Sequence, residues 1–420
     1  MNVIIKPNKL KGNVIIPPSK SLSHRAIIAA SLAEGKSVIS NVLYSKDIIA
    51  TINAMRACGA VIDEYEDYLV IQGGKVYRKE NIINANESGS TIRFMIPIAL
   101  VDPTPVTFVG NNHLVKRPLD TFFEIFDLQN IEYKREENYL PLYVNGGLKP
   151  GEFNIRGDIS SQFITGLLFA LPMLNGNSKI HITTNLESKG YVDLTLDMLK
   201  MFGIEIINDN YTDFYIQGNQ QYKPCDYTIE GDFSQSAFFF VAGCLGADIT
   251  LQAMNVDSHQ GDKKIISDII DLGGNIIEDN NGLKALNIKT KGCVIDFAQS
   301  PDLGPALTVL AALSEGKTEF INASRLRIKE CDRITCMKEE LNKLGANIEE
   351  NPDGMIIIGV DRLHGGIVES HNDHRVAMSL AMASLKCDGD IKILNAECVS
   401  KSFPNFWKVF ESLGGDVTYE

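Results

Sequence analysis

The segment MRACGAVID, residues 55–63, decides the fold, because it ends an amphipathic helix at a glycine and then begins a short strand. Glycine suits the end of a helix since it adopts positive φ at little cost. The pattern recurs in IFDLQNIEY, LKMFGIEII, IIDLGGNII, LNKLGANIE and FESLGGDVT. The equivalent positions are Gly59, Leu128, Gly203, Gly273, Gly345 and Gly414. Their spacing of roughly 70 residues divides the 420 residues into six units.

Each unit is predicted to contain a strand, a helix, a strand, a helix and a final pair of strands, because helical and alternating periodicities follow one another in that order. In the first unit the expected helices are SHRAIIAASLAEG, which Gly35 ends, and SKDIIATINAMRACG. The expected strands are SVISNVL, AVIDEY and YLVIQ. We therefore expect an α/β protein of six βαβαββ repeats.

Polar and basic residues return at the starts of the predicted helices. The first helices begin SHRA, TIRF, SSQF, QSAF, LGPA and DHRV, with third residues Arg25, Arg93, Gln162, Ala237, Pro305 and Arg375. The second helices likewise place Arg117, Lys189, Lys263, Arg333 and Lys401 near their starts. Cations oppose the dipole at a helix N-terminus unless an anion binds there. Several such ends around one centre would suit phosphates and carboxylates, although any single long side chain can instead extend into solvent.

Length and composition indicate a globular protein of two domains, since 420 residues exceed what one core usually supports. Hydrophobic residues make up 44% and charged residues 22%, which is ordinary for a folded chain. The net charge of -13 argues against broad binding to nucleic acid or anionic membranes. The N-terminus lacks the pattern of a secretion signal and no apolar run is long enough to span a membrane, so we expect a cytoplasmic protein.

The sequence does not favour a metal site, a nucleotide-binding loop or a DNA clamp. The eight cysteines are scattered, without a CxxC pair or zinc spacing, so we expect reduced thiols and no metal site. AEGKS, residues 33–37, suggests a nucleotide-binding loop, but Ala30 stands where that loop needs glycine. A sixfold ring such as a sliding DNA clamp would need basic faces without acidic residues among the cations.

A full-length resemblance follows from nine motifs taken in order. PPSKSLSHR, ESGSTIR, KRPL, GDISSQFITGLL, ESKGYVDLTL, SPDL, RIKECDR, NDHRVAMSLAMA and KSFPNFW together resemble the 5-enolpyruvylshikimate-3-phosphate (EPSP) synthase family. The resemblance implies an inside-out α/β barrel of two domains, each with three βαβαββ repeats, helices inside and sheets outside. It assigns residues 18–229 to the shikimate 3-phosphate side and residues 1–17 with 230–420 to the phosphoenolpyruvate side, with the active site in the cleft between the domains.

The family's reaction is the transfer of the carboxyvinyl group of phosphoenolpyruvate to the 5-hydroxyl of shikimate 3-phosphate, with release of phosphate. The resemblance implies small-molecule substrates, a monomer, and no metal or organic cofactor. The two substrates bring roughly six negative charges together. The surrounding cations repel one another when the site is empty, so we expect ligands to draw the domains together.

The resemblance also implies which residues bind each substrate, with Lys20 and Gln162 binding both. Shikimate 3-phosphate would be bound by Lys20, Ser21, Arg25, Ser160, Ser161, Gln162, Ser188, Tyr191, Asp302, Arg325 and Lys329. Phosphoenolpyruvate would be bound by Lys20, Gly89, Ser90, Arg117, Gln162, Arg333, His374, Arg375 and Lys401. The predicted catalytic residues are Asp302 as the base for the 5-hydroxyl, Glu330 as the acid for the vinyl carbon, and Lys20 as a partner in proton transfer.

Purely structural roles compete with these assignments. Ser21 and the serines of DISSQ are good helix caps, Asp302 could cap the helix after SPDL, and Glu330 could pair with a helix dipole. His374 could be an interior histidine. The chain departs from many relatives at Glu87, Ser88 and Ser90, and at Arg325, which could contact a phosphate or point to solvent.

The nearest rival is the related transferase that acts on UDP-N-acetylglucosamine. That family usually carries a cysteine acid in the loop before its arginine-proline pair. The corresponding loop here, NNHLVKRPLD, has no cysteine.

Overall fold

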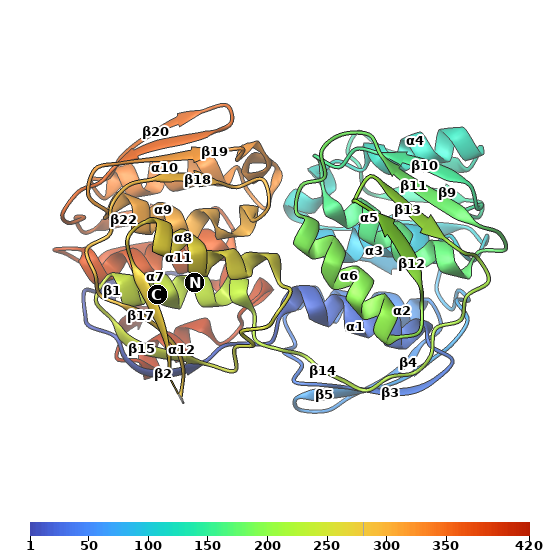
Figure 1. Cartoon of the computed structure of the whole chain (residues 1–420), viewed down its shortest axis with the longest axis horizontal. Helices are drawn as coiled ribbons and strands as arrows, with labels where there is room; N and C mark the ends of the chain where they lie inside the picture. Colours follow the sequence, from blue (N-terminus) through green and yellow to red (C-terminus); the bar gives the residue numbers. More distant parts are fainter. Residues whose placement is uncertain (280) are drawn as a thin grey trace. The chain divides into compact units, whose positions relative to one another are not determined.

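The computed structural model describes residues 1–279 and 281–420 and divides into two compact units (Figure 1). One unit is Lys20–Ile229, called here the 20–229 unit. The other joins Met1–Ser19 to Glu230–Glu420 and is called the 230–420 unit. Each has its own hydrophobic core.

The 20–229 unit contains three four-stranded sheets with the same topology, β14-β3-β5-β4, β6-β7-β9-β8 and β10-β11-β13-β12. In each, a parallel pair is followed by two antiparallel pairings. The strands are β3 (Gly35–Ser40), β4 (Val61–Glu64), β5 (Tyr68–Gly73), β6 (Ile82–Asn84), β7 (Val106–Val109), β8 (Glu132–Arg135), β9 (Leu142–Asn145), β10 (Glu152–Ile155), β11 (Ser178–Ile182), β12 (Ile206–Asp209), β13 (Asp213–Ile216) and β14 (Tyr227–Thr228). The helices are α1 (Lys20–Leu32), α2 (Lys46–Ala57), α3 (Gly89–Ala99), α4 (Asp120–Gln129), α5 (Ser161–Ala170) and α6 (Lys189–Met201), with the 3-10 turns η1 (Asn112–Lys116) and η2 (Leu171–Met173).

The 230–420 unit repeats this design with sheets β2-β15-β17-β16, β18-β19-β21-β20 and β22-β23-β1-β24. The strands are β1 (Val3–Lys6), β2 (Lys11–Ile15), β15 (Asp248–Gln252), β16 (Asn275–Asp279), β17 (Gly282–Leu286), β18 (Val294–Asp296), β19 (Lys317–Ile321), β20 (Asn347–Asn351), β21 (Gly354–Ile358), β22 (Gly366–Glu369), β23 (Ile391–Leu394) and β24 (Asp416–Tyr419). The helices are α7 (Phe233–Cys244), α8 (Ile265–Asp271), α9 (Gly304–Ala312), α10 (Arg333–Lys343), α11 (His374–Ala383) and α12 (Phe406–Ser412), with the 3-10 turns η3 (Gly261–Lys264), η4 (Pro301–Leu303), η5 (Ser324–Ile328), η6 (Ser384–Lys386) and η7 (Ala396–Lys401).

Of the six sheets in residues 1–279 and 281–420, three are completed by strands from a distant part of the chain. In the 230–420 unit, β1 lies between β23 and β24 in the last sheet, and β2 lies beside β15 in the first. In the 20–229 unit, β14 comes last in the chain and pairs with β3, the first strand, with Tyr227 opposite Ile39. Each added strand supplies the partner that an edge or gap would otherwise lack.

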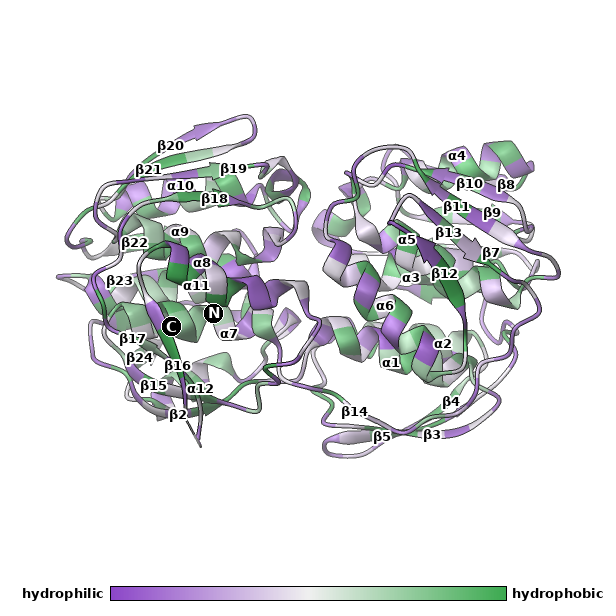
Figure 2. Cartoon of the chain, in the orientation of Figure 1, coloured by the Kyte–Doolittle hydropathy of each residue, from purple (hydrophilic) through white to green (hydrophobic). Residues whose placement is uncertain are grey.

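The first helix of each repeat forms the interior of its unit. Helices α7, α9 and α11 are buried along their whole length and contact one another, and α3 packs on α5 in the other unit. A helix that is apolar on all sides belongs in a core. The strands alternate buried and accessible residues, and both hydropathy colours appear along the sheets (Figure 2). The predicted fold class, six βαβαββ repeats with helices inside and sheets outside, is confirmed.

Two local predictions were wrong. Leu128 lies inside α4, and the left-handed residue that ends this helix is Asn130, with φ 53. Asparagine replaces glycine there because its short polar side chain tolerates the left-handed region. Helix α1 ends at Leu32, so Gly35 does not close it but begins β3 with φ 140.

Lys36 and Ser37 lie within β3, which rules out a helix-opening phosphate loop at AEGKS. None of the helices in residues 1–279 and 281–420 combines the length and apolar character needed to cross a membrane.

Candidate active site

Lys20 is the first residue of α1, where the sequence predicted a basic cluster at a helix start. Its ammonium Nζ lies 2.9 Å from Oδ2 of Asp47, in the first turn of α2. Sequence reasoning did not assign Asp47, although SKDI places an acid at the start of the helix that follows. The ion pair holds the Lys20 ammonium at the N-terminal ends of two helices.

Arg25 lies one turn further along α1 and is almost fully buried. Its Nε donates to Thr195 Oγ1 at 2.9 Å, and its two terminal nitrogens donate to the carbonyls of Ser21 at 2.7 Å and Tyr191 at 2.8 Å and to Thr165 Oγ1 at 3.4 Å. Burial lowers the pKa of Arg25 to about 10, still well above neutral pH. These contacts bring the predicted residues Ser21, Arg25 and Tyr191 together, with a permanent positive charge held by neutral oxygens.

A second group joins the starts of α3 and α5. Arg93 donates to Gln162 Oε1 at 2.8 Å, and Gln162 Nε2 donates to Ser90 Oγ at 2.9 Å. Gly89, the first residue of α3, lies against Arg117, since a Cβ at Gly89 would be 2.3 Å from Arg117 Nη1. The absence of a side chain at Gly89 is what lets the guanidinium lie there.

The predicted phosphate-binding serines lie at helix starts. Ser160 caps α5 by accepting from Gln162 N at 3.3 Å, which confirms that it has the structural role of a helix cap. Ser161 is the first residue of that helix. Ser188, directly before α6, is fully buried and has φ 56. A residue with a side chain is uncommon in this left-handed conformation and is often found at functional sites.

A buried polar chain that sequence reasoning did not assign links α1, α2 and α3. His24 Nδ1 lies 2.7 Å from Thr51 Oγ1, Thr51 lies 2.7 Å from Thr91 Oγ1, and Thr91 donates to Ser88 Oγ at 2.8 Å. Burial, with Lys20 and Arg25 nearby, lowers the pKa of His24 well below its ordinary value, so the ring is neutral near pH 7. The chain positions Ser88, the N-cap of α3, immediately before Gly89.

In the 230–420 unit, Arg333 joins three carboxylates. Its nitrogens lie 2.9 Å from Asp302 Oδ1, 2.6 Å from Glu330 Oε2 and 2.7 Å from Asp373 Oδ2. Although burial opposes it, Asp373, Glu330 and Asp302 raise the pKa of Arg333 well above its ordinary value. Asp373, the N-cap of α11, was not assigned from the sequence, although it directly precedes His374 and Arg375. One guanidinium thus holds both predicted catalytic carboxylates within a single cluster.

Two further cations face Asp302. Lys329 Nζ lies 3.2 Å from Asp302 Oδ1, and Arg375 Nη2 lies 3.5 Å from Oδ2. Burial lowers the pKa of Lys329 to about 8, although Asp302 acts in the opposite direction. Asp302 lies in the turn η4 rather than at the cap of α9, so the capping alternative is wrong.

The remaining predicted residues of this unit surround the cluster. Lys401 Nζ donates to the carbonyl of Asn372 at 2.7 Å, two residues before His374. His374 is the first residue of α11 and is buried, with Nδ1 3.9 Å from Asp373 Oδ1. Arg325 is buried and donates to the carbonyl of Ala298 at 3.3 Å, so the alternative that it points to solvent is wrong.

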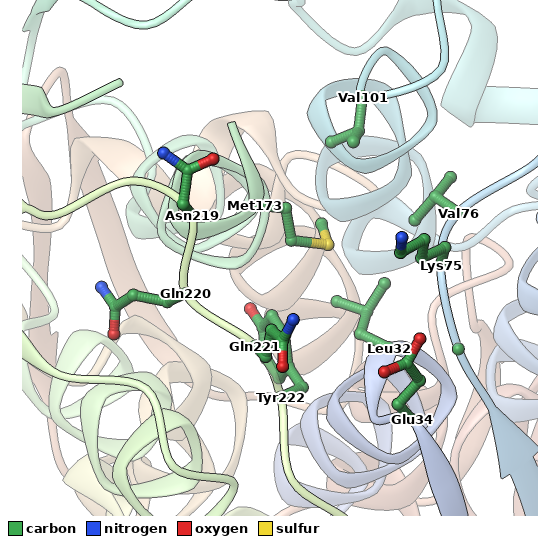
Figure 3. Close-up of a pocket in the computed structure, with 11 residues that line it drawn as sticks. Leu32, Glu34, Lys75, Val76, Val101, Met173, Asn219, Gln220, Gln221 and Tyr222 are labelled. Carbon is green, nitrogen blue, oxygen red and sulfur yellow. The ribbon is translucent and has the colours of Figure 1, made fainter. Parts of the chain in front are cut away.

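A pocket in the 20–229 unit lies away from these helix starts (Figure 3). Leu32, at the end of α1, Val101, just after α3, and Met173, at the end of η2, contribute to its lining together with Tyr222. It therefore lies near the C-terminal ends of the helices, and none of its lining residues is a predicted site residue.

Comparison with known proteins identifies the family. A match to the family described as EPSP synthase (3-phosphoshikimate 1-carboxyvinyltransferase) spans residues 4–410. The chain belongs to the EPSP synthase family.

A 3-phosphoshikimate 1-carboxyvinyltransferase of Clostridium perfringens (strain ATCC 13124) is 53% identical over 416 residues, covering 98% of each chain. That of Clostridioides difficile (strain 630) is 53% identical over 427 residues, covering 98% of this chain and 97% of the relative. A solved structure of EPSP synthase from Acinetobacter baumannii matches with a TM-score of 0.82 and 27% identity over the whole of both chains.

These relationships confirm the predicted family and activity. The chain is an enzyme of the shikimate pathway, and hence of aromatic amino acid biosynthesis, that transfers the carboxyvinyl group of phosphoenolpyruvate to shikimate 3-phosphate. The rival acting on UDP-N-acetylglucosamine is not favoured.

Proposed function

We propose that the two residue clusters are the two halves of one active site, and that they perform the carboxyvinyl transfer together in a cleft between residues 18–229 and residues 1–17 with 230–420. The observation that carries this proposal is the guanidinium of Arg333, which holds Asp302 and Glu330 in one cluster with Lys329 beside them. A carboxylate pair among cations suits a reaction in which one proton leaves a hydroxyl and another reaches carbon.

The 20–229 unit would bind most of shikimate 3-phosphate. Arg25 has neutral oxygen partners, so its positive charge is available to the carboxylate of the substrate. Ser21, whose carbonyl accepts from Arg25, would bind the substrate beside it. The hydroxyls of Ser160, Ser161 and Ser188 at two helix N-termini would bind the 3-phosphate. Tyr191, Gln162, Lys20 and, from the other unit, Asp302, Arg325 and Lys329 would complete the set.

Phosphoenolpyruvate would lie among arginines, because a guanidinium matches carboxylate and phosphate oxygens in pairs. Arg117 and Gly89 in one unit, and Arg333 and Arg375 in the other, are the main elements of this proposal. Further ligands would be Lys20, Ser90, Gln162, His374 and Lys401.

In the proposed mechanism, Asp302 takes the proton of the 5-hydroxyl while that oxygen attacks C2 of phosphoenolpyruvate. Glu330 gives a proton to C3, which becomes a methyl group, and a tetrahedral intermediate results. The same groups then act in reverse: a methyl proton returns to Glu330, the bond between C2 and the phosphate oxygen breaks, and phosphate leaves with the proton that Asp302 had taken. Lys20 would assist these proton transfers, and the cations would stabilise the developing charge.

The test uses Asp302→Asn and Glu330→Gln, which keep side-chain shape but remove the acid-base group. Phosphate release with both substrates is expected to fall by about 10²- to 10⁴-fold in each. Glu339→Gln, an exposed carboxylate on the same helix as Arg333, is the matched control and should keep full turnover. Near-normal turnover in either folded test variant would remove that residue from its proposed role.

We further propose that the protein acts as a monomer in the cytoplasm. Every residue of the proposed site comes from one chain, which supports the first part. All eight cysteines are free thiols, as is usual for proteins of a reducing compartment.

A further inference from the structure

Two cysteines follow the predicted acid Glu330 within six residues of the chain. Cys331 follows it in the chain, and Cys336 lies in the second turn of α10. Each thiol shifts the pKa of the other, and each residue is 7% exposed. The mechanism above uses neither thiol.

The start of α10 explains why these thiols meet. Asp332 is the N-cap, and its side chain accepts from Thr335 N at 3.2 Å. Cys331 therefore occupies the position before the cap and Cys336 the fourth helical position, the two places whose side chains commonly pack together at a helix start. The helix end thus holds the two sulfur atoms as neighbours.

The surroundings of the pair differ at its two ends. Cys331 Sγ lies 3.7 Å from Asp373 Oδ2, the same carboxylate that accepts from Arg333. His371, which lowers the pKa of Cys336, has its Nε2 2.7 Å from Glu340 Oε1. The His371 side chain is 27% exposed, so this end of the cluster reaches solvent.

Electrostatics favour a thiolate at Cys336. The hydrogen bond with Cys331 lowers the pKa of Cys336 to about 6, burial opposes this, and His371 lowers it further. The hydrogen bonds with Cys336 and Glu340 raise the pKa of His371 to about 10. A thiolate paired with an imidazolium is the reactive form of cysteine, whereas the pKa of Cys331 is raised by its hydrogen bond with Cys336 and by burial.

We propose that Cys331 and Cys336 are a modification site that hydrogen peroxide converts to a reversible disulfide, and that this disulfide inhibits the enzyme. The Cys336 thiolate attacks one peroxide oxygen, the O–O bond breaks, and the departing hydroxide takes a proton to become water. The Cys331 thiol then attacks the sulfenic sulfur, the S–S bond forms, and the hydroxyl leaves with the thiol proton as a second water. Two thiols are oxidised by two electrons and one peroxide is reduced to two waters.

Inhibition follows from the position of the pair in the chain. The disulfide replaces the Cys331 thiol beside Asp373 and constrains the backbone between Glu330 and Arg333. This inhibitory part rests on the roles proposed for Glu330 and Arg333, whereas the disulfide itself does not.

The test treats the full-length enzyme with hydrogen peroxide, blocks remaining thiols with N-ethylmaleimide, and measures both phosphate release and peptide masses. A peptide pair joined through Cys331 and Cys336, lighter by two hydrogen atoms, is expected. Activity should fall by about tenfold or more, as expected for displaced catalytic groups, and return with dithiothreitol. Cys336→Ser should have wild-type activity before treatment and should not show this reversible loss of activity. The control is Cys225→Ser, which removes a partly exposed thiol elsewhere and should lose activity as the wild type does.

Two results would overturn the proposal. One is the absence of the joined peptide, and the other is an equal reversible loss in Cys336→Ser. A joined peptide without loss of activity would disprove the inhibition alone. The proposed catalytic roles are tested separately, by the turnover of Asp302→Asn and Glu330→Gln without peroxide.

Discussion

The two units share one scaffold, but Arg25 in one unit and Arg333 in the other have opposite kinds of partner. In the 20–229 unit, the partners of Arg25 are hydroxyl and carbonyl oxygens. In the 230–420 unit, Arg333 is surrounded by Asp302, Glu330 and Asp373. Arg25 is the sixth residue of α1, and Arg333 is the first residue of α10.

This difference shows how one repeated backbone supports two electrostatic environments. Neutral partners orient a guanidinium and leave its positive charge for an anionic ligand. Carboxylate partners cancel that charge and add groups that can exchange protons. The repeat therefore supplies the helix ends, and the neighbouring side chains decide whether a guanidinium there has neutral or carboxylate partners.

The largest expected effect comes from removing each arginine in turn. Arg333→Met leaves carboxylates uncompensated around a buried site and should destabilise its unit by about 3 to 5 kcal/mol. Arg25→Met leaves neutral acceptors and should cost about 1 to 3 kcal/mol. The chain has one tryptophan, Trp407 in α12, so its fluorescence during urea unfolding reports on the 230–420 unit.

The midpoint of the tryptophan transition should move to a lower urea concentration in Arg333→Met and stay in place in Arg25→Met. The loss of stability in Arg25→Met should appear in the unfolding curve measured by circular dichroism. Equal shifts of the tryptophan transition in both variants would mean that the units unfold as one, and the comparison between them would fail.

Gly89→Ala sharpens the comparison within the 20–229 unit. Its Cβ would lie 2.3 Å from Nη1 and 2.8 Å from Cζ of Arg117, so the guanidinium must move. The KM for phosphoenolpyruvate should rise by about 10- to 100-fold, the value of hydrogen bonds to a charged group, while that for shikimate 3-phosphate stays close to wild type. Gly74→Ala is the matched control, because a Cβ there meets nothing within 4 Å. An unchanged KM for phosphoenolpyruvate would separate Arg117 from that substrate.

The smallest expected effect is a pH dependence from Lys329, whose pKa burial lowers to about 8. Above that pH the free enzyme loses the ammonium charge, so kcat/KM for shikimate 3-phosphate should fall by up to about tenfold per pH unit. Lys329→Arg keeps its charge and should remove this limb of the profile. The sign for stability is opposite: between pH 8 and the ordinary lysine value of 10.5 the unfolded chain binds more protons, so folding stability rises with pH. A wild-type profile that is flat to pH 9.5 would contradict the role of Lys329.

Local sequence patterns predicted most of the repeated elements and missed what depends on exceptions. Gly59, Gly203, Gly273, Gly345 and Gly414 all have positive φ, as a glycine stop requires. Asn130 was missed because asparagine is a weaker signal for the same conformation. Among the site residues, Asp47 and Asp373 were missed, since an acid at a helix start is usually a cap and only its spatial partner gives it another meaning.

The amino-acid sequence by itself determined the sixfold repeat, the α/β class and the placement of polar residues at helix starts, because periodicity and turn chemistry act between near neighbours. The tertiary structure decided that β1, β2 and β14 complete sheets far from their own positions in the chain. It also decided that Arg333 pairs with Asp302 and with Asp373. Such pairings depend on distances between groups that only packing brings together, since electrostatic attraction follows separation in space and not separation along the chain.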